Sequence, residues 1–577
     1  MKRVLIVGSG IAGLSCAIEC AGKGMEVTLV SPFPSERAQS VLAAGGINAV
    51  LKPTDKLQGN EQNEGTDNVK DKSESFDTIS SHISDTLRGG CYIAGEEAVK
   101  GLCTDAPEII RWLEKKGTVF TRDANGEIAR RAFGGQSQKR TCYCGSATGK
   151  QIVTALVMEA RRFEGEGKIK RILWMDFYKA LIKDGKCYGA IFYNEAKADL
   201  EMIPADYLVI ATGGQNALFG KTTGSTLCDG YAQGKLFMQG VELKNLEFIQ
   251  YHPTTLETAQ KMLLVSEAVR GEGGRLYYTE NGERVYFMEN LYGERGNLMP
   301  RDVVSRTMES TGKEIFLDIS FLGKEEIIKR IPEVYDLCLK YRGIDISKES
   351  IPVTPSVHFF MGGIAVKNNH ETNVANLYAI GECASIYHGA NRLGGNSLLA
   401  AIHGARVAAE DIAIKTSTLV NNTDTLAGKT AGSFAPDFNA ELESERAVLA
   451  KRWASESAFP VMYIRDMLAE NLKEDLGIVR DEAKLQNGLD DVDYYLSIAD
   501  KIHYDRSEMA YLGFSITGIL TLAKATLTCA KFREESRGAH YRSDYPDTKE
   551  NWQSSTIISY DNGEYHTRLD LEKEYES

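Results

Sequence analysis

The sequence predicts an α/β fold: a Rossmann-like domain in two separated segments, an inserted α+β domain between them, and a C-terminal helical bundle. Three observations support this. Residues 4–7 form a strand-like run that leads into the glycine-rich turn GSGIAG at 8–13 and then into an apolar helical stretch. A strand-like run that occurs much later in the chain ends at residues 381–382. From about residue 436 apolar side chains recur at four-residue spacing, which is typical of packed helices.

Composition limits the classes of function. A chain of 577 residues with 43% hydrophobic residues can bury large cores and should form several domains. A net charge of -13 argues against nucleic acid as a partner, so an anionic ligand would need local arginines. The 11 cysteines include no CxxC pair, and the nine histidines show no metal-ligand spacing. We expect no metal site, and reduced thiols in a cytoplasmic protein.

The N-terminus could pass for a signal peptide, because MKR precedes an apolar run. Glycines at positions 8, 10 and 13 interrupt that run, and no cleavage site follows it. We found no other stretch of about 18 apolar residues, the length that a membrane span requires. The sequence therefore predicts no signal peptide and no direct membrane span.

The glycine-rich turn has the spacing of a dinucleotide fingerprint. Gly8, Gly10 and Gly13 permit a tight turn and a close approach of backbone amides to a pyrophosphate, at a helix N-terminus. Residues 27–30 form the second strand. Ser31 follows it, where an acid often holds the ribose, and a serine hydroxyl can still bond a ribose.

Two later strands return to the same domain. ADYLVIATGGQNALF, residues 205–219, is a strand that ends near Thr212-Gly213, and NVANLYAIGECAS, residues 373–385, is a strand that ends in Gly381-Glu382. An N-terminal fingerprint with a late returning strand suits an FAD domain built from discontinuous segments. Nicotinamide enzymes rarely need the returning piece, so we predict FAD.

The predicted organisation has five parts: 1–238, the first part of the FAD domain; 239–352, the inserted domain; 353–420, the return of the FAD domain; 436–540, a helical domain; and 541–577, a tail. Residues 52–78 are polar and predict a surface excursion. The tail is polar and tyrosine-rich, and we expect it to wrap a neighbour or a partner subunit. We assign no chemistry to the helical domain.

Candidate chemical groups lie in the inserted segment and in the return. They occur in FIQYHPT, LLVSEAVRGEGG, LMPRDVVSR, PSVHFFMGGI and GANRLGGNSLL. Taken singly, a histidine here would more often be structural, an arginine would be salt-bridged, and Glu267 with Arg270 would be a helix-surface pair. Together they gather beside glycine-rich or proline-marked turns in an acidic chain, which favours an anion site.

With these motifs, the chain resembles the flavoprotein subunits of succinate dehydrogenase and fumarate reductase, a family that also includes L-aspartate oxidase. HISDTLRGG, FGGQ, ATGG and ESRGAHYRSDYP extend the resemblance over nearly the whole chain. The resemblance implies a flavin domain, a mobile capping domain and a C-terminal helical domain. It also implies a four-carbon dicarboxylate as substrate.

The resemblance assigns roles residue by residue. His252, Ser266, His358 and Arg392 would hold the two carboxylates and polarise the double bond. The flavin N5 would pass a hydride to one alkene carbon, and Arg301 would give a proton to the other. An arginine is an unusual acid because its pKa lies near 12.5 or above. A relay through Glu267 and Arg270 would reload it.

The resemblance also implies where the cofactor lies. The residues placed against FAD are Gly8, Gly10, Ala12, Gly13, Ser31, Ser40, Gly45, Gly46, Thr212, Gly213, Asp229, Glu382, Ser397 and Leu398. Many members carry a histidine that bonds covalently to the flavin, in a pattern like SHTVAAQGG. Here the stretch is AQSVLAAGG, with Gln39 at that position and Ala44 in place of the usual Gln or Glu. We therefore predict non-covalent FAD and favour fumarate reduction over succinate oxidation.

Three functions stay open at this point. The first is a fumarate reductase or succinate dehydrogenase flavoprotein subunit that receives electrons from an iron–sulfur protein and lies at the inner face of the membrane, with or without an anchor subunit. The second is L-aspartate oxidase, whose members also lack the covalent histidine. The third is a flavin-binding relative that acts on another unsaturated acid or only carries electrons. Retention of His252, Arg301, His358 and Arg392 argues against the third.

The stretch ARRAFGGQSQKR, residues 129–140, separates the first two. In L-aspartate oxidases the matching loop resembles Glu-Gly-Gly-His, and its glutamate faces the ammonium group of the substrate. Phe133 stands there in this chain and suits the hydrocarbon middle of a dicarboxylate. We expect the glycines to let the loop close, and the flanking cations, Arg130 to Arg131 and Lys139 to Arg140, to raise the local anion concentration.

Overall fold

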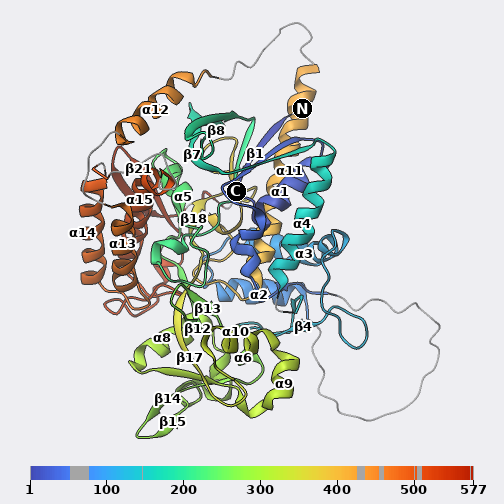
Figure 1. The fold of residues 1–577 in the computed structure, drawn as a ribbon, viewed down its shortest axis with the longest axis vertical. Coiled ribbons are helices and arrows are strands. Elements are labelled where there is room, and N and C mark those ends of the chain that lie inside the picture. Colours follow the sequence, from blue (N-terminus) through green and yellow to red (C-terminus); the bar gives the residue numbers. More distant parts are fainter. Residues whose placement is uncertain are drawn as a thin grey trace, which may run out of the picture.

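The computed structural model describes the chain except residues 1, 52–76, 146, 425–435, 454–459, 500, 503–509, 572 and 576–577. The predicted surface excursion falls almost wholly on 52–76 and so lies outside the described residues. The predicted fold class is confirmed: mixed α/β sheets are followed by a helical C-terminal region (Figure 1).

A parallel five-stranded sheet forms the centre of the large body. Its order is β19 (Leu377–Ala379), β10 (Tyr207–Ile210), β1 (Arg3–Val7), β2 (Glu26–Ser31) and β6 (Ile169–Leu173). Helix α1 (Ile11–Gly22) follows β1 and packs against α11 (Asn396–Asp424) and α4 (Thr148–Gly165). Every residue of β10 is buried, as expected of a strand that is covered on both faces. Strand β19 comes from the late segment, so two distant parts of the chain build one sheet.

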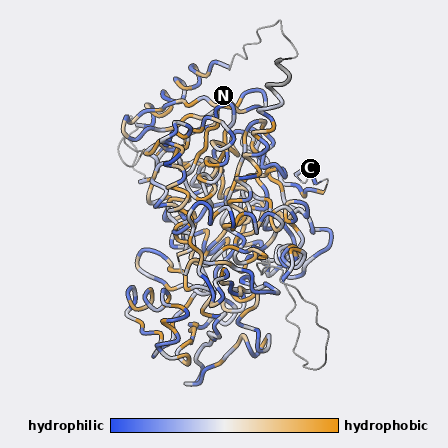
Figure 2. Tube along the Cα trace, turned by 90° about the vertical axis from the view of Figure 1, so that its right-hand side faces the viewer, coloured by the Kyte–Doolittle hydropathy of each residue, from blue (hydrophilic) through white to orange (hydrophobic). Residues whose placement is uncertain are grey.

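Smaller elements surround this sheet. An antiparallel sheet comprises β7 (Met175–Lys183), β8 (Lys186–Asn194) and β9 (Asp199–Pro204), and another comprises β3 (Ile47–Asn48), β5 (Thr141–Cys142) and β4 (Arg130–Arg131). Helices α2 (Ile79–Gly89), α3 (Glu96–Lys115) and α5 (Tyr231–Phe237) complete this part. Apolar stretches run through the middle of the body in Figure 2, and many hydrophilic stretches lie at its outline.

The inserted segment forms a lobe with its own hydrophobic core (Figure 1, yellow-green). Its six-stranded sheet runs β13 (Met262–Leu264), β12 (Ile249–Glu257), β17 (Ile351–Phe360), β16 (Ile315–Asp318), β14 (Arg275–Glu280) and β15 (Glu283–Val285). Its helices are α6 (Ala268–Gly271), α7 (Phe287–Tyr292), α8 (Arg301–Thr311), α9 (Gly323–Arg330) and α10 (Pro332–Arg342). The predicted boundary at 352 lies within β17, which joins this lobe to the large body.

Four helices occupy most of the predicted helical domain: α12 (Asn439–Trp453), α13 (Val461–Asp475), α14 (Glu482–Ala499) and α15 (Ala510–Phe532). Helix α15 is long and apolar enough to cross a membrane, and the sequence analysis overlooked it. Of its most apolar window, 72% is buried inside the protein. It packs against α5 and α14, as the core helix of a globular domain does.

The last strands correct the prediction for the tail. Strands β21 (Thr556–Asp561) and β22 (Glu564–Leu569) form a hairpin in a sheet with β11 (Leu243–Lys244), β18 (Gly363–Ala365) and β20 (Ala384–Ser385). Leu243 pairs with Ile558, so the end of the chain completes a sheet of its own protein. The first three residues of β21, Thr556 to Ile558, are buried in succession, a short run that the polar residues around it mask in the sequence.

Candidate active site

A cavity of about 420 Å³ lies where the two segments of the Rossmann-like domain meet the inserted lobe. The β1–α1 turn, the ends of β2 and β10, and the start of α11 line one part of it. Side chains from β12, β17 and the start of α8 line another part. The elements that line it are therefore those to which the sequence analysis assigned the cofactor and the substrate.

The N-terminus of α1 suits a pyrophosphate. Gly10 caps the helix with no side-chain hydrogen bond, and no acidic residue lies in the first turn. Free amides at this end carry the partial positive charge of the helix. Close to them, Ser40 Oγ accepts a hydrogen bond from Ile11 N at 3.2 Å, and Ser9 Oγ lies 3.0 Å from Ser31 Oγ. The residues present therefore fit FAD.

All but one of the predicted cofactor residues line the cavity. The exception is Gly13, where an added Cβ would lie 1.9 Å from Gly8 O, so this glycine serves the packing of the turn on the helix. Asp229 lines the cavity, but its carboxylate already accepts hydrogen bonds from Tyr511 Oη (2.9 Å) and Arg465 Nη2 (3.1 Å). The helical domain thus contacts a residue of the cofactor cavity.

Gln39 and the following glycines form another stretch of the wall. Gln39 Oε1 accepts a hydrogen bond from Ser225 N, which fixes this side chain at the cavity wall. Arg131 donates hydrogen bonds to Gly45 O and Ala44 O, so it holds this segment by its carbonyl groups. Arg131 therefore acts on the cavity wall.

The two predicted histidines meet in the cavity, with ring centroids 5.2 Å apart. His358 Nδ1 lies 2.8 Å from Thr223 Oγ1, and His252 Nδ1 lies 3.3 Å from Thr254 N. Burial first, and then the charge of Arg301, lower the pKa of both imidazoles well below the usual value. Both rings are therefore neutral at pH 7.

Arg301 and Arg392 also come together, through a residue that the sequence analysis missed. Arg301 Nη1 and Arg392 Nη2 donate to the same atom, Gln250 Oε1, at 3.0 and 2.9 Å. Gln250 Nε2 in turn donates to Asn391 Oδ1 at 2.7 Å. Burial and the charge of Arg301 lower the pKa of Arg392 to about 9, so it stays charged at pH 7. The only sequence signal for Gln250 was its place in the quoted FIQYHPT.

Glu267 connects Arg301 to a third arginine, Arg270. Its Oε2 accepts from Arg301 Nη2 at 2.8 Å, and its Oε1 lies 3.4 Å from Arg270 Nη2. Burial alone would raise the pKa of this carboxyl, but the two arginines and the amide of Gly134 bring it to about 2. Arg270 is fully buried behind Glu267, outside the cavity lining, and donates to Asn297 O.

The loop at 133–136 closes over this group. Gly134 N donates to Glu267 Oε1 at 2.9 Å, and a Cβ added at Gly134 would lie 2.4 Å from that oxygen. Phe133 is buried and lines the cavity, and its ring lies against Gly45 and Gly394. Ser266 lines the cavity beside Glu267. The predicted substrate residues therefore all line the same cavity.

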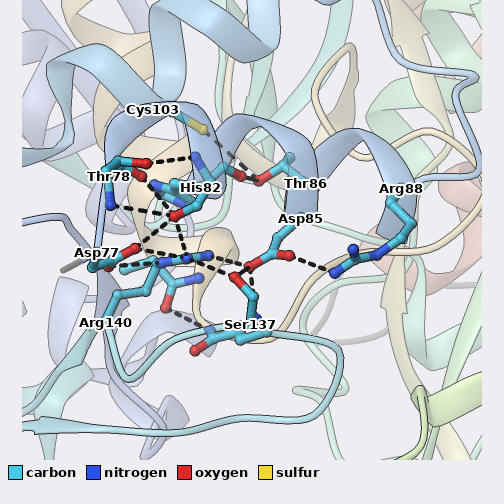
Figure 3. Close-up of polar contacts among 12 residues, drawn as sticks. Asp77, Thr78, His82, Asp85, Thr86, Arg88, Cys103, Ser137 and Arg140 are labelled. Atoms are coloured by element: carbon cyan, nitrogen blue, oxygen red, sulfur yellow. Dashed lines mark hydrogen bonds and ion pairs between the residues drawn. The ribbon is translucent and has the colours of Figure 1, made fainter. Parts of the chain in front are cut away.

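Two of the four cations beside this loop, Arg131 and Arg140, do not act as we expected. Figure 3 shows Arg140 between Asp77 and Asp85, to which it donates hydrogen bonds at 2.9 and 2.6 Å. Its side chain is 0% exposed, so it ties the loop to α2 and does not attract anions. The neighbouring Lys139 and the more distant Arg130 are exposed. Within the described residues no group of three or more His, Cys, Asp or Glu could hold a metal ion.

Comparison with known proteins places this site in a family. Residues 3–398 match the family model described as an FAD binding domain, and residues 465–575 match the one described as fumarate reductase flavoprotein C-term. The succinate dehydrogenase flavoprotein subunit of Bacillus subtilis (strain 168) is 33% identical over 97% of this chain and 94% of its own length. The chain belongs to the succinate dehydrogenase and fumarate reductase flavoprotein family.

Members of this family with other names are similar too. The L-aspartate oxidase of Yersinia pestis is 31% identical over 96% of this chain and 98% of its own length. A solved structure of E. coli quinol fumarate reductase, a variant of its FrdA chain, superposes with a TM-score of 0.84 at 27% identity, covering 99% of this chain and 97% of that one. The resemblance, the fold class and the FAD cofactor predicted from the sequence are thereby confirmed, and the protein is an FAD-dependent oxidoreductase of the succinate dehydrogenase and fumarate reductase flavoprotein family.

Proposed function

We propose that the chain is the catalytic flavoprotein subunit of an enzyme that interconverts fumarate and succinate and favours fumarate reduction. The observation that carries this is the charge of the site. Arg270 and Arg301 contact one ionised carboxylate, Glu267, and Gln250 holds Arg392 beside Arg301, so these side chains carry a net charge of +2. Glu382 also acts on Arg392, but burial raises the pKa of Glu382 to about 7, so it offsets only part of this charge at neutral pH. A buried excess of this size suits a ligand with two negative charges.

The neutral histidines complete the set of groups that can bind the two carboxylates. His252 and His358 can offer N–H groups to carboxylate oxygens without adding charge, and Ser266 can offer a hydroxyl. Arg392 can hold one carboxylate while the other carboxylate lies against the remaining groups of this set, the two histidines and Ser266. A diacid gripped at both ends is held with its double bond polarised, so binding energy lowers the barrier.

Proton delivery is assigned to Arg301. When bound, FAD supplies hydride transfer to and from the middle carbons of the diacid. The positive charge of Arg301 stabilises the negative charge that develops on the substrate, and Arg301 then gives its proton to the other carbon and becomes neutral. Glu267, 2.8 Å from Arg301 and 3.4 Å from Arg270, takes a proton from Arg270 and passes it to the neutral Arg301. Arg270 thus acts through Glu267.

Gln39 supports non-covalent FAD. A carboxamide at the cavity wall has no nucleophilic ring nitrogen, and its Oε1 is already engaged by Ser225 N. We propose that the missing bond lowers the flavin potential, which favours fumarate reduction. The likeness to a protein named as a flavoprotein subunit supports a partner protein, and we propose that this partner is an iron–sulfur protein that supplies the electrons. That partner would hold the chain at the cytoplasmic face of the membrane, with or without an anchor subunit.

L-aspartate oxidase is the alternative, because a relative of that name aligns over the whole chain. Its substrate carries an ammonium group, and burying an unpaired ammonium costs several kcal/mol. Phe133 offers no charge to it, and both oxygens of Glu267 are engaged by Gly134, Arg270 and Arg301. The loop therefore favours a substrate without nitrogen.

The two functions separate in one assay. We expect fumarate reduction with a reduced-dye donor, competitive inhibition by malonate-like diacids, and negligible oxidation of L-aspartate. Formation of iminoaspartate or peroxide from L-aspartate, at a rate comparable to fumarate reduction, would establish the alternative. As an internal comparison, Phe133→Glu should lose fumarate turnover, because its carboxylate repels the dianion, and Phe133→Leu should retain most of it.

A further inference from the structure

A buried carboxyl group that the proposed reaction does not use lies in the cofactor cavity. Asp176, in β7, lines the cavity and is only 4% exposed. Its Oδ2 is buried and has no hydrogen-bond partner. An unpaired buried carboxyl oxygen is unfavourable, and a bound ligand with a suitably placed donor removes that cost.

The position of Asp176 identifies which part of the cofactor it faces. Ser31, at the end of β2, stands where this fold holds the adenosine ribose. Ser31 pairs with Leu173, the last residue of β6, and Asp176 follows three positions later. Trp174 lies between Leu173 and Asp176 in the sequence. Its ring stands edge-on to the ring of Phe33, with the two ring centroids 6.4 Å apart. Asp176 therefore lies on the adenosine side of the cavity.

The surroundings suit a purine. Phe33, Phe177 and Tyr511 line the cavity together with Asp176 and supply aromatic surface for a flat ring. The exocyclic amino group of adenine is a hydrogen-bond donor, whereas a 6-oxopurine has an acceptor at that position. A carboxyl oxygen that can only accept distinguishes these two bases.

Protonation determines what Asp176 can offer. Burial first, and then the charges of Glu195 and Asp229, raise the pKa of Asp176 to about 8. Its hydrogen bond to Glu195 therefore uses the Asp176 proton, with a Glu195 oxygen as the acceptor. Asp229 is paired with Arg465, and Tyr511 Oη donates to Asp229. The unpartnered Oδ2 is then the carbonyl oxygen, an acceptor.

We propose that Asp176 Oδ2 accepts a hydrogen bond from the exocyclic amino group of the adenine of FAD, and that this contact selects an adenine over a 6-oxopurine. The contact is independent of the substrate and of the direction of the reaction. It rests on the proposed function only in requiring FAD that can be removed and added back.

The test is a binding titration. Flavin-depleted protein is titrated with FAD and with its deaminated analogue, in which hypoxanthine replaces adenine, and the quenching of flavin fluorescence gives each Kd. We expect the wild-type protein to bind FAD at least about tenfold more tightly than the deaminated analogue. This is the loss of affinity that one buried oxygen left unpaired produces. Equal affinities for the two dinucleotides in the wild-type protein would overturn the proposal without any variant.

Variants show whether Asp176 causes the preference. Asp176→Asn keeps a neutral group with a donor for Glu195 and an acceptor, so it should preserve the preference. Asp176→Ala should bind the two dinucleotides with similar affinity. Asp184→Asn, on the exposed β7–β8 turn, is the matched control and should behave as wild type. A full preference in Asp176→Ala, or an equal weakening of both ligands as expected for a ribose contact, would refute the proposal.

Discussion

Arg301 and Arg392, 91 positions apart in the sequence, donate hydrogen bonds to one oxygen atom, Gln250 Oε1, at 3.0 and 2.9 Å. One carboxamide dipole thus holds two guanidinium groups that would otherwise repel each other in a buried site. The spacing between the proposed proton donor and the proposed carboxylate clamp depends on this uncharged residue.

Gln250→Glu should weaken fumarate binding. The new carboxylate removes one of the two uncompensated positive charges and accepts from both arginines more strongly than the amide does. We expect the KM for fumarate to rise by about tenfold or more, with FAD affinity unchanged. Gln260→Glu, on the exposed β12–β13 turn, is the control for the added charge. An unchanged KM in Gln250→Glu would contradict the charge argument.

Arg301→Ala should leave FAD bound and the fold intact, since Arg301 acts on the substrate. Turnover should fall by several orders of magnitude, because proton delivery and charge stabilisation are lost together. Arg301→Lys should restore little, because lysine lacks the planar fork that contacts Glu267 and Gln250. Steady-state fumarate reduction and the flavin absorbance measure the two properties separately. Near-normal turnover in the alanine variant would exclude Arg301 as the acid.

Glu267 should make the stability depend on pH in the acid range. Its pKa falls from the ordinary 4.5 to about 2 in the folded protein. The stabilisation is therefore fully present above about pH 4.5 and is lost as the pH falls through 2, and it amounts to roughly 3 kcal/mol. Denaturant unfolding of the wild-type protein and Glu267→Gln should differ more at pH 7 than at pH 3. A difference independent of pH would show that the carboxylate is not held ionised; exposed Glu280→Gln is the control.

Denaturation by acid or detergent should release all the yellow flavin into solution, because Gln39 offers no nucleophilic nitrogen. The measurement is the visible absorbance of the precipitated polypeptide and of the supernatant. Flavin retained on the washed polypeptide would show a covalent bond through another residue.

Arg140 and its neighbour Lys139 should respond differently to the same change. Arg140→Met leaves the carboxylate of Asp77 without its ion pair and that of Asp85 with Arg88 alone, which costs about 3–5 kcal/mol of unfolding free energy. Lys139→Met, at an exposed position, should change stability by less than about 0.5 kcal/mol. Urea unfolding of the holoproteins measures both. If Arg140→Met keeps its stability and only raises the KM for fumarate, Arg140 attracts substrate after all.

The same pair shows where prediction from the sequence ends. Lys139 and Arg140 look alike in the sequence, yet one is exposed and the other lies fully buried against α2. The burial depends on Asp85, which is 55 positions away and whose contact no local pattern reveals. A charge beside a loop can therefore be recognised from sequence, but its partner cannot.

Residues with distinctive chemistry were predictable, and those that position them were not. His252, His358, Arg301 and Arg392 stood out because charged or titratable groups beside glycines and prolines predict a site. Gln250 did not, because an amide in an apolar strand carries no charge signal. The fold class followed from short-range patterns around 4–13 and 373–385. Strand β21 did not, since its partner β11 lies more than 300 positions earlier.

That pairing sets a limit on how the protein is made. Leu243 leaves the ribosome long before Ile558, so the sheet with β11 cannot be completed until nearly the whole chain has been synthesised. The edge of β11 that β21 covers stays open during translation, with backbone groups free to pair with other strands. A nascent chain that stalls before residue 556 therefore exposes this edge. The pairing of β11 with β21 is a folding step that comes at the end of translation or after it.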